Sequence, residues 1–185
     1  MRIVGGRLRG RALAAPKSNA VRPTADRLRE ALFNILVHAY DDPVTDARVL
    51  DLFAGTGALG LEALSRGAAF ALFVDDGAEA RALLRENVAA LGLGGATRIF
   101  RRDATKLGAA HPIEPFSLAF LDPPYGQGLA EKALAAARAG GWLAADALIV
   151  VEEAAKSGFA VPEGFEELER RTYDDTMLVF LGYRA

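Results

Sequence analysis

The sequence predicts an open, mostly parallel α/β sheet with helices on both faces and an antiparallel hairpin at its C-terminal end. Short apolar segments alternate with segments of helical periodicity between residues 49 and 151. Strands separated by helices of this length imply parallel βαβ units. A glycine-rich loop follows the first apolar segment, and the last two strand-like segments have no helix between them. Ligands of such sheets lie beyond the carboxyl ends of the strands.

Local patterns predict the individual elements. Thr24 can cap a helix that has Asp26 in its first turn and stops by Asp41. Residues 2–13 combine β-branched and aliphatic residues with glycines, which predicts a small N-terminal β-hairpin extension. We expect the other strands at 49–53, 70–74, 97–100, 117–121, 148–151, 165–173 and 177–183, and the other helices at 59–65, 78–91 and about 129–139.

The composition predicts a single cytoplasmic domain without a metal. The 185 residues have room for one full core, which we divide into a basic hairpin or arm at 1–23 and a Rossmann-like core at 24–185. No apolar run reaches the ~20 residues of a membrane span, and the N-terminus does not resemble a secretory signal. The absence of cysteine excludes disulfides, thiolate metal sites and a cysteine nucleophile. We expect the only histidines, His38 and His111, to be surface residues.

The charge is distributed unevenly along the chain. The formal net charge is −2, but residues 1–30 hold eight basic and two acidic residues, whereas the remainder is net acidic. The first segment is therefore a candidate contact for a polyanion on an otherwise acidic body. A solvated, flexible basic arm is the simpler alternative.

The glycine loop is compatible with two classes of cofactor. Gly55, Gly57 and Gly60 match the G-x-G-x-x-G fingerprint of dinucleotide-binding proteins, so a nicotinamide-dependent oxidoreductase is one alternative. Asp75 can accept ribose hydroxyls of either NAD or S-adenosylmethionine. Asp51 favours the second, because a carboxylate is unfavourable beside an anionic pyrophosphate and suitable beside an ammonium and a sulfonium.

The tetrapeptide Asp122-Pro123-Pro124-Tyr125 follows the fourth expected strand, at the same edge of the sheet. Asp122 and the Pro123 carbonyl can each accept an N–H of an amine and direct its lone pair at a methyl donor. The two prolines fix the backbone and offer no competing donor. Tyr125 offers a flat face on which an extruded base can stack. The tetrapeptide resembles a motif of amino methyltransferases, and this resemblance implies methylation of an amino nitrogen.

Several segments together resemble the RsmD-type family of bacterial 16S rRNA guanine-N2 methyltransferases. Asp51-Leu-Phe-Ala-Gly-Thr-Gly57 is similar to the first motif of class I methyltransferases, and residues 122–125 to the (Asp/Asn)-Pro-Pro-(Tyr/Phe) motif of amino methyltransferases. The block 22–34, Arg-Pro-Thr-Ala-Asp-Arg-Leu-Arg-Glu-Ala-Leu-Phe-Asn, is the most family-specific, and Arg-Ile-Val-Gly-Gly-Arg at 2–7 completes the order. Asp75-Asp76 departs from the family, where a glutamate is usual, and so does Asp174-Asp175, where a glycine is expected.

The resemblance implies S-adenosylmethionine as cofactor, no metal, and a guanine of 16S rRNA in the assembling small subunit as substrate. DNA adenine or cytosine and protein glutamine remain alternatives that share the tetrapeptide. We expect a monomer that binds no membrane. The implied catalytic residues are Asp122, Pro123 and Tyr125. The implied cofactor residues are Asn34, Asp51, Phe53, Ala54, Gly55, Thr56, Gly57, Asp75, Asp103, Ala104 and Asp122. The implied RNA contacts are Arg7, Arg9, Arg11, Arg22, Arg27 and Tyr125.

Overall fold

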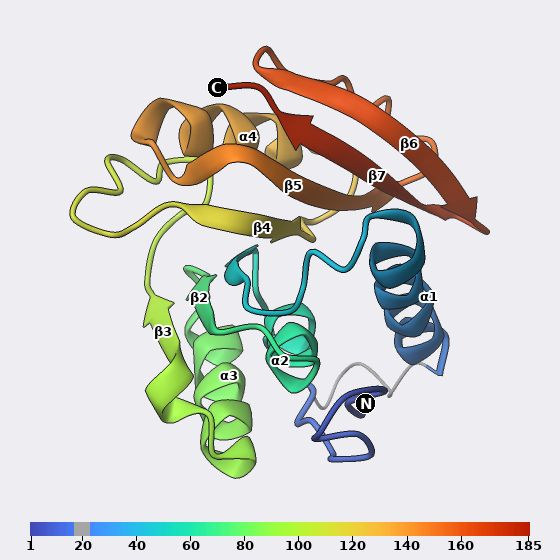
Figure 1. Ribbon diagram of the computed structural model, residues 1–185, viewed down its shortest axis with the longest axis vertical. Coiled ribbons are helices and arrows are strands. Elements are labelled where there is room, and N and C mark those ends of the chain that lie inside the picture. The colour runs from blue at the N-terminus through green and yellow to red at the C-terminus, as the bar shows by residue number, and fades with distance from the viewer. Residues whose placement is uncertain (17–22) are drawn as a thin grey trace.

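The computed structural model describes residues 1–16 and 23–185, and within them the strands form one seven-stranded sheet of order β3-β2-β1-β4-β5-β7-β6 (Figure 1). Strands β1 to β5 run parallel, and β7 is antiparallel to both β5 and β6. The predicted fold class is confirmed. The elements are α1 Pro23–Ala39, β1 Arg48–Leu52, α2 Ala58–Ser65, β2 Phe70–Val74, α3 Ala78–Leu91, the 3₁₀ turn η1 Gly94–Ala96, β3 Thr97–Phe100, β4 Phe116–Leu121, α4 Leu129–Gly140, β5 Leu143–Ala154, β6 Phe165–Tyr173 and β7 Thr176–Tyr183.

Helices cover both faces of the sheet, because the buried strand residues alternate between two cores. One core joins Leu36, Leu61 and Leu84, from α1, α2 and α3, to residues such as Phe120. The other joins α4 to the opposite face, where Trp142 is fully buried and donates to the Gly108 carbonyl at 2.8 Å. Parallel strands in this setting are apolar on both sides, which explains why their sequences are continuous hydrophobic runs.

Most boundaries agree with the sequence prediction to within one residue, and two differences are informative. Helix α1 already includes Pro23, so Thr24 lies within its first turn and is not the cap. Strand β5 extends far beyond 148–151, to Leu143–Ala154. Only its centre is apolar, and its polar continuation through Glu152 and Glu153 pairs with β7. Partner strands, rather than hydrophobicity, fix the ends of this strand.

The N-terminal segment folds back on itself but is less regular than a β-hairpin. Its one bridge pairs Arg2 with Ala12, and the Ile3 amide donates to the Arg11 carbonyl at 2.9 Å. Gly6 and Gly10 have positive φ values of 77° and 86° and form the turns between these ends. The expected hairpin is therefore reduced to a single bridge within the part of the chain described.

The C-terminal hairpin agrees with the sequence prediction. Tyr173 pairs with Thr176 across a two-residue turn, Asp174-Asp175. Asp174 has a φ of 53°, a left-handed conformation that aspartate tolerates better than most residues with a side chain. The departure from glycine at this turn is thus accommodated by the residue type.

Candidate active site

Acidic side chains gather where the parallel strands end. Strand β1 pairs with β2 on one side and with β4 on the other. The strand order therefore changes direction at β1, which makes this position a topological switch point. Ligands of open α/β sheets bind at such a switch point. We call the acidic residues at this edge the acidic rim: Asp51 in β1, Asp75 after β2, Asp103 after β3, Asp122 after β4, and Glu152 and Glu153 in β5.

The three glycines of the loop after β1 serve different purposes. Gly60 is a packing position, since a Cβ there would lie 2.4 Å from Phe73 Cε1, whereas Gly57 combines a φ of 82° with a Cβ position 2.2 Å from Leu84 Cδ1. Gly55 has a φ of 58°, and a Cβ there would meet nothing within 4 Å. Its need for glycine is conformational, and the open space beside it leaves the backbone free to approach a ligand.

Hydrogen bonds to the end of β2 and to Asp75 fix the conformation of the loop. Phe53 has a φ of 56°, which is strained for an aromatic residue, and the buried Ala54 amide donates to the Val74 carbonyl at 3.1 Å. The Asp75 carboxylate accepts from the Gly55 amide at 2.9 Å and from the Gly77 amide at 2.8 Å. Asp76 is exposed, and the two amides are bonded to Asp75. Of the two neighbouring aspartates, Asp75 is therefore the one that belongs to the loop.

Asp51 lies beneath the loop and is only 1 % exposed. Its carboxylate accepts from the Gly60 amide at 3.0 Å, at the start of α2. Burial raises the pKa of Asp51 to about 8, and the nearby charge of Asp75 contributes, while the Gly60 hydrogen bond opposes the shift. A cation above the loop would offset this cost of burying a carboxylate.

Asp103 and Ala104 occupy the β3 end of the acidic rim. Asp103 accepts hydrogen bonds from the amide and hydroxyl of Thr105, at 2.8 and 2.7 Å, which lower its pKa. Ala104 is buried against the core beneath. Asp103 thus closes a local turn and stays ionised.

The tetrapeptide continues β4 beside this loop. The Asp122 amide approaches the Leu52 carbonyl at 3.5 Å, which keeps the segment in line with β1. Pro123 is buried and Pro124 is exposed, while Tyr125 is 42 % exposed. The structure therefore brings the tetrapeptide and the glycine loop, which lie about 70 residues apart in the sequence, to the same edge of the sheet.

Glu152 and Glu153 belong to this site, although the sequence patterns did not identify them. The Tyr125 hydroxyl donates to Glu152 Oε2 at 2.6 Å, and the Gly126 amide donates to Glu153 Oε1 at 2.9 Å. Burial and the charge of Glu152 raise the pKa of Tyr125. Two glutamates at the end of a strand have no motif spacing, and only the pairing of β4 with β5 relates them to the tetrapeptide.

The pKa of Asp122 lies well above its ordinary value. Surrounding protein atoms desolvate its carboxyl, which raises the pKa. The charge and hydrogen bonding of Glu152 favour the protonated form further. Asp122 also exposes surface to the open site, so water reduces this effect without reversing it. The tetrapeptide thus presents a carboxyl group with which no basic side chain of the described residues forms an ion pair.

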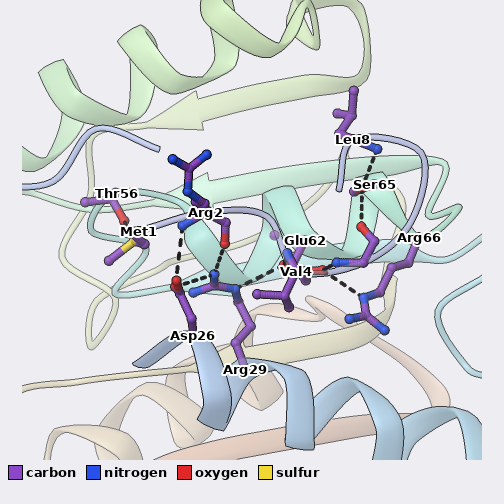
Figure 2. Close-up of polar contacts among 12 residues, drawn as sticks. Met1, Arg2, Val4, Leu8, Asp26, Arg29, Thr56, Glu62, Ser65 and Arg66 are labelled. Atoms are coloured by element: carbon purple, nitrogen blue, oxygen red, sulfur yellow. Dashed lines mark hydrogen bonds and ion pairs between the residues drawn. The ribbon is translucent and has the colours of Figure 1, made fainter. Parts of the chain in front are cut away.

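The basic N-terminal segment is anchored through a buried glutamate (Figure 2). Glu62 of α2 is fully buried and accepts from the amides of Val4 and Gly5 at 3.0 and 2.9 Å. It also pairs with Arg29 at 3.1 Å and Arg66 at 2.8 Å. We call this group, with Asp26, which pairs with Arg29 at 2.9 Å, the N-terminal clamp. A flexible arm is excluded for residues 1–16.

The predicted RNA-contact arginines have different surroundings. Arg7, Arg9, Arg11 and Arg27 are all exposed. Arg11 also donates to the Ala90 carbonyl at 2.6 Å. Arg22 lies outside the described residues. Arg29 belongs to the same basic stretch but is 4 % exposed and serves the N-terminal clamp.

The N-terminal segment also reaches the glycine loop. Asn87 of α3 donates to the carbonyls of Thr56 and Ala14, at 2.9 and 3.2 Å, and accepts from the Ala14 amide at 2.7 Å. The Thr56 hydroxyl lies 3.8 Å from Met1 Sδ. Asn34, on α1, is exposed, as are His38 and His111. The N-terminal segment therefore supports one wall of the loop, and the Asn34 side chain lies at the surface of α1.

No group of three or more potential metal ligands occurs among residues 1–16 and 23–185. Over the same residues, no helix is long and apolar enough to cross a membrane.

The fold and the site define a class I methyltransferase, and comparisons with known proteins identify the family. A family model described as Conserved hypothetical protein 95 matches residues 1–182. Ribosomal RNA small subunit methyltransferase D of Escherichia coli is 43% identical over 158 residues, which are 85% of this chain and 77% of that protein. Putative rRNA methyltransferase YlbH of Bacillus subtilis is 39% identical over 68% of this chain and 67% of its own. The solved structure of putative methyltransferase yhhF from Escherichia coli superposes with a TM-score of 0.83 at 35% identity, covering 100% of this chain and 98% of that one. The chain belongs to the Conserved hypothetical protein 95 family, and it is a methyltransferase.

Proposed function

We propose that this enzyme transfers a methyl group from S-adenosylmethionine to the exocyclic N2 amine of a guanine in small-subunit rRNA. The observation that carries the proposal is the tetrapeptide at 122–125, placed at the end of β4 next to the glycine loop of β1. The rRNA substrate is supported by the similarity to ribosomal RNA small subunit methyltransferase D of Escherichia coli. The proposed setting is the cytoplasm, during assembly of the subunit, with the chain acting as a monomer.

The residues of the site fit a cationic cofactor. The acidic rim holds several carboxylates, and among the described residues no ion pair neutralises Asp51, Asp75 or Asp122. Such a rim repels a pyrophosphate and attracts an ammonium or sulfonium, so it disfavours a nicotinamide dinucleotide. When bound, S-adenosylmethionine supplies an electrophilic methyl group on a positively charged sulfur.

Each part of the glycine loop has an assigned partner in this proposal. Asp51 and the backbone of residues 53–57 would hold the methionine end, and Asn34 of α1 would close that side. Asp75 would accept the ribose hydroxyls, since its carboxylate already lies against Gly55. Asp103 and Ala104 would flank the adenine at the end of β3.

The tetrapeptide would make the amine reactive by orienting it. An aryl amine is a poor nucleophile because its lone pair is delocalised into the ring. Asp122 Oδ and the Pro123 carbonyl would each accept an N–H, which favours a tetrahedral nitrogen whose lone pair is localised and directed at the methyl donor. The buried Pro123 keeps both acceptors in place. As the N–C bond forms and the S–C bond breaks, the nitrogen loses one proton, for which Asp122 and solvent are the available acceptors.

Exposed arginines of the N-terminal segment would contact the phosphates of the RNA. Arg7 and Arg9 are exposed on a segment that the N-terminal clamp holds against α2. A fixed basic surface beside an acidic site would hold the RNA by its backbone while one base enters the site. This division favours nucleic acid over a protein glutamine as substrate.

The test is to incubate the purified enzyme with labelled S-adenosylmethionine and small subunits from cells that lack it. We expect label in 16S rRNA and N2-methylguanosine in the nuclease digest, and mapping then gives the nucleotide. Naked rRNA and genomic DNA serve as parallel substrates. Label found only in protein or only in DNA adenine would reject the proposed substrate.

A further inference from the structure

We propose that Glu152 reads the N1–H of the target guanine while Asp122 receives its N2 amine, so that the two carboxylates together select guanine. This inference rests on the proposed function and assigns a specificity residue to the same site. It requires that Glu152 lie beside Asp122, that its carboxylate face the base, and that a neighbouring carboxylate favour guanine over other amines.

The sheet places the two carboxylates side by side. Leu121 of β4 pairs with Val151 of β5 in parallel register. Asp122 and Glu152 are the next residues on these strands, whose backbones lie about 4.8 Å apart, so both side chains leave the sheet on the same face. This register brings the Glu152 carboxylate close enough to Asp122 for its charge to act on that carboxyl.

Tyr125 shows that Glu152 points into the site. The phenol oxygen, at the tip of the ring, donates to Glu152 Oε2 at 2.6 Å and lies 3.4 Å from the Thr176 hydroxyl. A base that stacks on this half-exposed ring therefore has one edge beside the Glu152 carboxylate. A carboxylate has about four acceptor positions, so Glu152 retains the capacity to accept a hydrogen bond from the base beside its contacts with Tyr125 and Asp122.

Glu153 has a different role despite its position. It is 1 % exposed, and its Oε1 accepts from the amides of Gly126 and Ala154 at 2.9 and 2.8 Å. It therefore supports the loop after Tyr125. Of the two glutamates, Glu152 is the one available to a substrate.

Guanine is the base that fits two adjacent carboxylates. Its Watson–Crick edge presents the N1–H donor next to the N2 amine. Adenine and cytosine present an acceptor nitrogen next to their amine, and that acceptor would face a carboxylate unfavourably. A glutamine amide has no second donor in this position. A site built around a donor rejects analogues that lack it, because the buried acceptor is then left unpaired.

The experiment compares guanine with 2-aminopurine, which keeps the 2-amino group but has a bare acceptor at N1. Small subunits are reconstituted with either base at the mapped position, and kcat/KM is measured for the wild type and for Glu152→Gln. We expect the wild type to prefer guanine by about 100-fold or more. Glu152→Gln should lose about tenfold or more on guanine and narrow the preference at least about tenfold, because its amide can donate to the bare N1.

Tyr125→Phe is the matched control. It removes the hydrogen bond to Glu152 and keeps the stacking ring, so it should change kcat/KM for both bases by a similar factor. Calorimetry with S-adenosylhomocysteine checks that Glu152→Gln remains folded and binds the cofactor product as the wild type does. The inference is overturned if Glu152→Gln keeps the wild-type preference, or if Tyr125→Phe narrows it equally. If the wild type methylates neither particle, the proposed function fails and this inference fails with it.

Discussion

The acidic rim and the N-terminal clamp use carboxylates in opposite ways. In the clamp, Glu62 is fully buried and its charge is met by Arg29 and Arg66. In the rim, Asp51 is buried to the same extent but has one backbone hydrogen bond and another aspartate for a neighbour. Removing a carboxylate from water is costly unless a partner compensates. The clamp is compensated within the chain, whereas the rim requires a partner from outside.

This difference distinguishes carboxylates with a structural role from carboxylates with a functional role, which a count of charged residues does not. The clamp is assigned to stabilising the fold, and the rim to binding a cationic ligand. Each assignment predicts the effect of a substitution. Changes in the clamp should alter the free energy of unfolding. Changes in the rim should alter activity, ligand affinity and their pH dependence.

The largest effect is expected from Glu62→Ala in the clamp. The substitution leaves the 4 %-exposed Arg29 with Asp26 as its remaining ion-pair partner and removes the acceptor of the Val4 and Gly5 amides. Breaking a buried pair in this way costs about 3–5 kcal/mol. Urea denaturation should show this loss in the free energy of unfolding. Glu163→Gln is the control, because the Arg138–Glu163 pair is exposed and should leave the unfolding midpoint unchanged. Equal unfolding midpoints for the two variants would contradict the stabilising role assigned to the clamp.

The next effect is expected from Asp122→Ala in the rim. The loss of one positioned acceptor at the reacting nitrogen should lower kcat about 100- to 1000-fold, with S-adenosylhomocysteine affinity retained. Asp122→Asn keeps an oxygen acceptor at the same place and should retain most of the activity. Steady-state kinetics on small subunits, with calorimetry for the ligand, separates the two. Unchanged turnover in Asp122→Ala would remove this residue from the mechanism.

The fold was more predictable from the sequence than the site. Strands such as Phe70–Val74 and Thr97–Phe100 were predicted to the residue, because their apolar runs end at glycines or polar residues. Strand β5 was predicted too short, because its N-terminal end is fixed by pairing with β4 and its polar C-terminal end by pairing with β7. The rim was incomplete for the same reason, since Glu152 lies in that unrecognised extension.

Long-range pairing accounts for the remaining differences. Arg29 contributed to the basic character of residues 1–30, yet it is buried against Glu62, 33 residues away. Local charge patterns contain no information about such a partner. Gly57 and Gly60 were recognised by spacing alone, whereas the reason for them, the approach of Leu84 and Phe73, depends on α3 and β2. Their spacing indicates these glycines as a group but not the separate reason for each.

A smaller effect is expected in the pH dependence of the rim. Because the pKa of Asp51 is raised to about 8 by burial, the folded protein binds more protons than the unfolded chain between its ordinary pKa and pH 8. The stability of the free protein should therefore fall as pH rises through this window. Binding a cation favours the carboxylate, so affinity for S-adenosylhomocysteine, which keeps its ammonium, should rise by up to about tenfold per unit from pH 6 to pH 8. Calorimetry across this range provides the measurement. Asp51→Asn should flatten both profiles, and an unchanged slope in that variant would assign the titration to another group.

The smallest effect is expected from the exposed arginines that the clamp supports. Arg7→Gln combined with Arg9→Gln removes two exposed charges without touching Glu62 or Arg29. Each phosphate contact contributes about one unit to the slope of log affinity against log salt, so the double variant should reduce that slope by about two. Filter binding of small-subunit rRNA between low and moderate salt measures the change. Arg184→Gln, at an exposed position paired with Glu166 near the C-terminus, is the control and should keep the wild-type slope. If the double variant keeps it too, the N-terminal surface is solvated in the complex, and the acidic rim must receive its substrate by contacts made elsewhere.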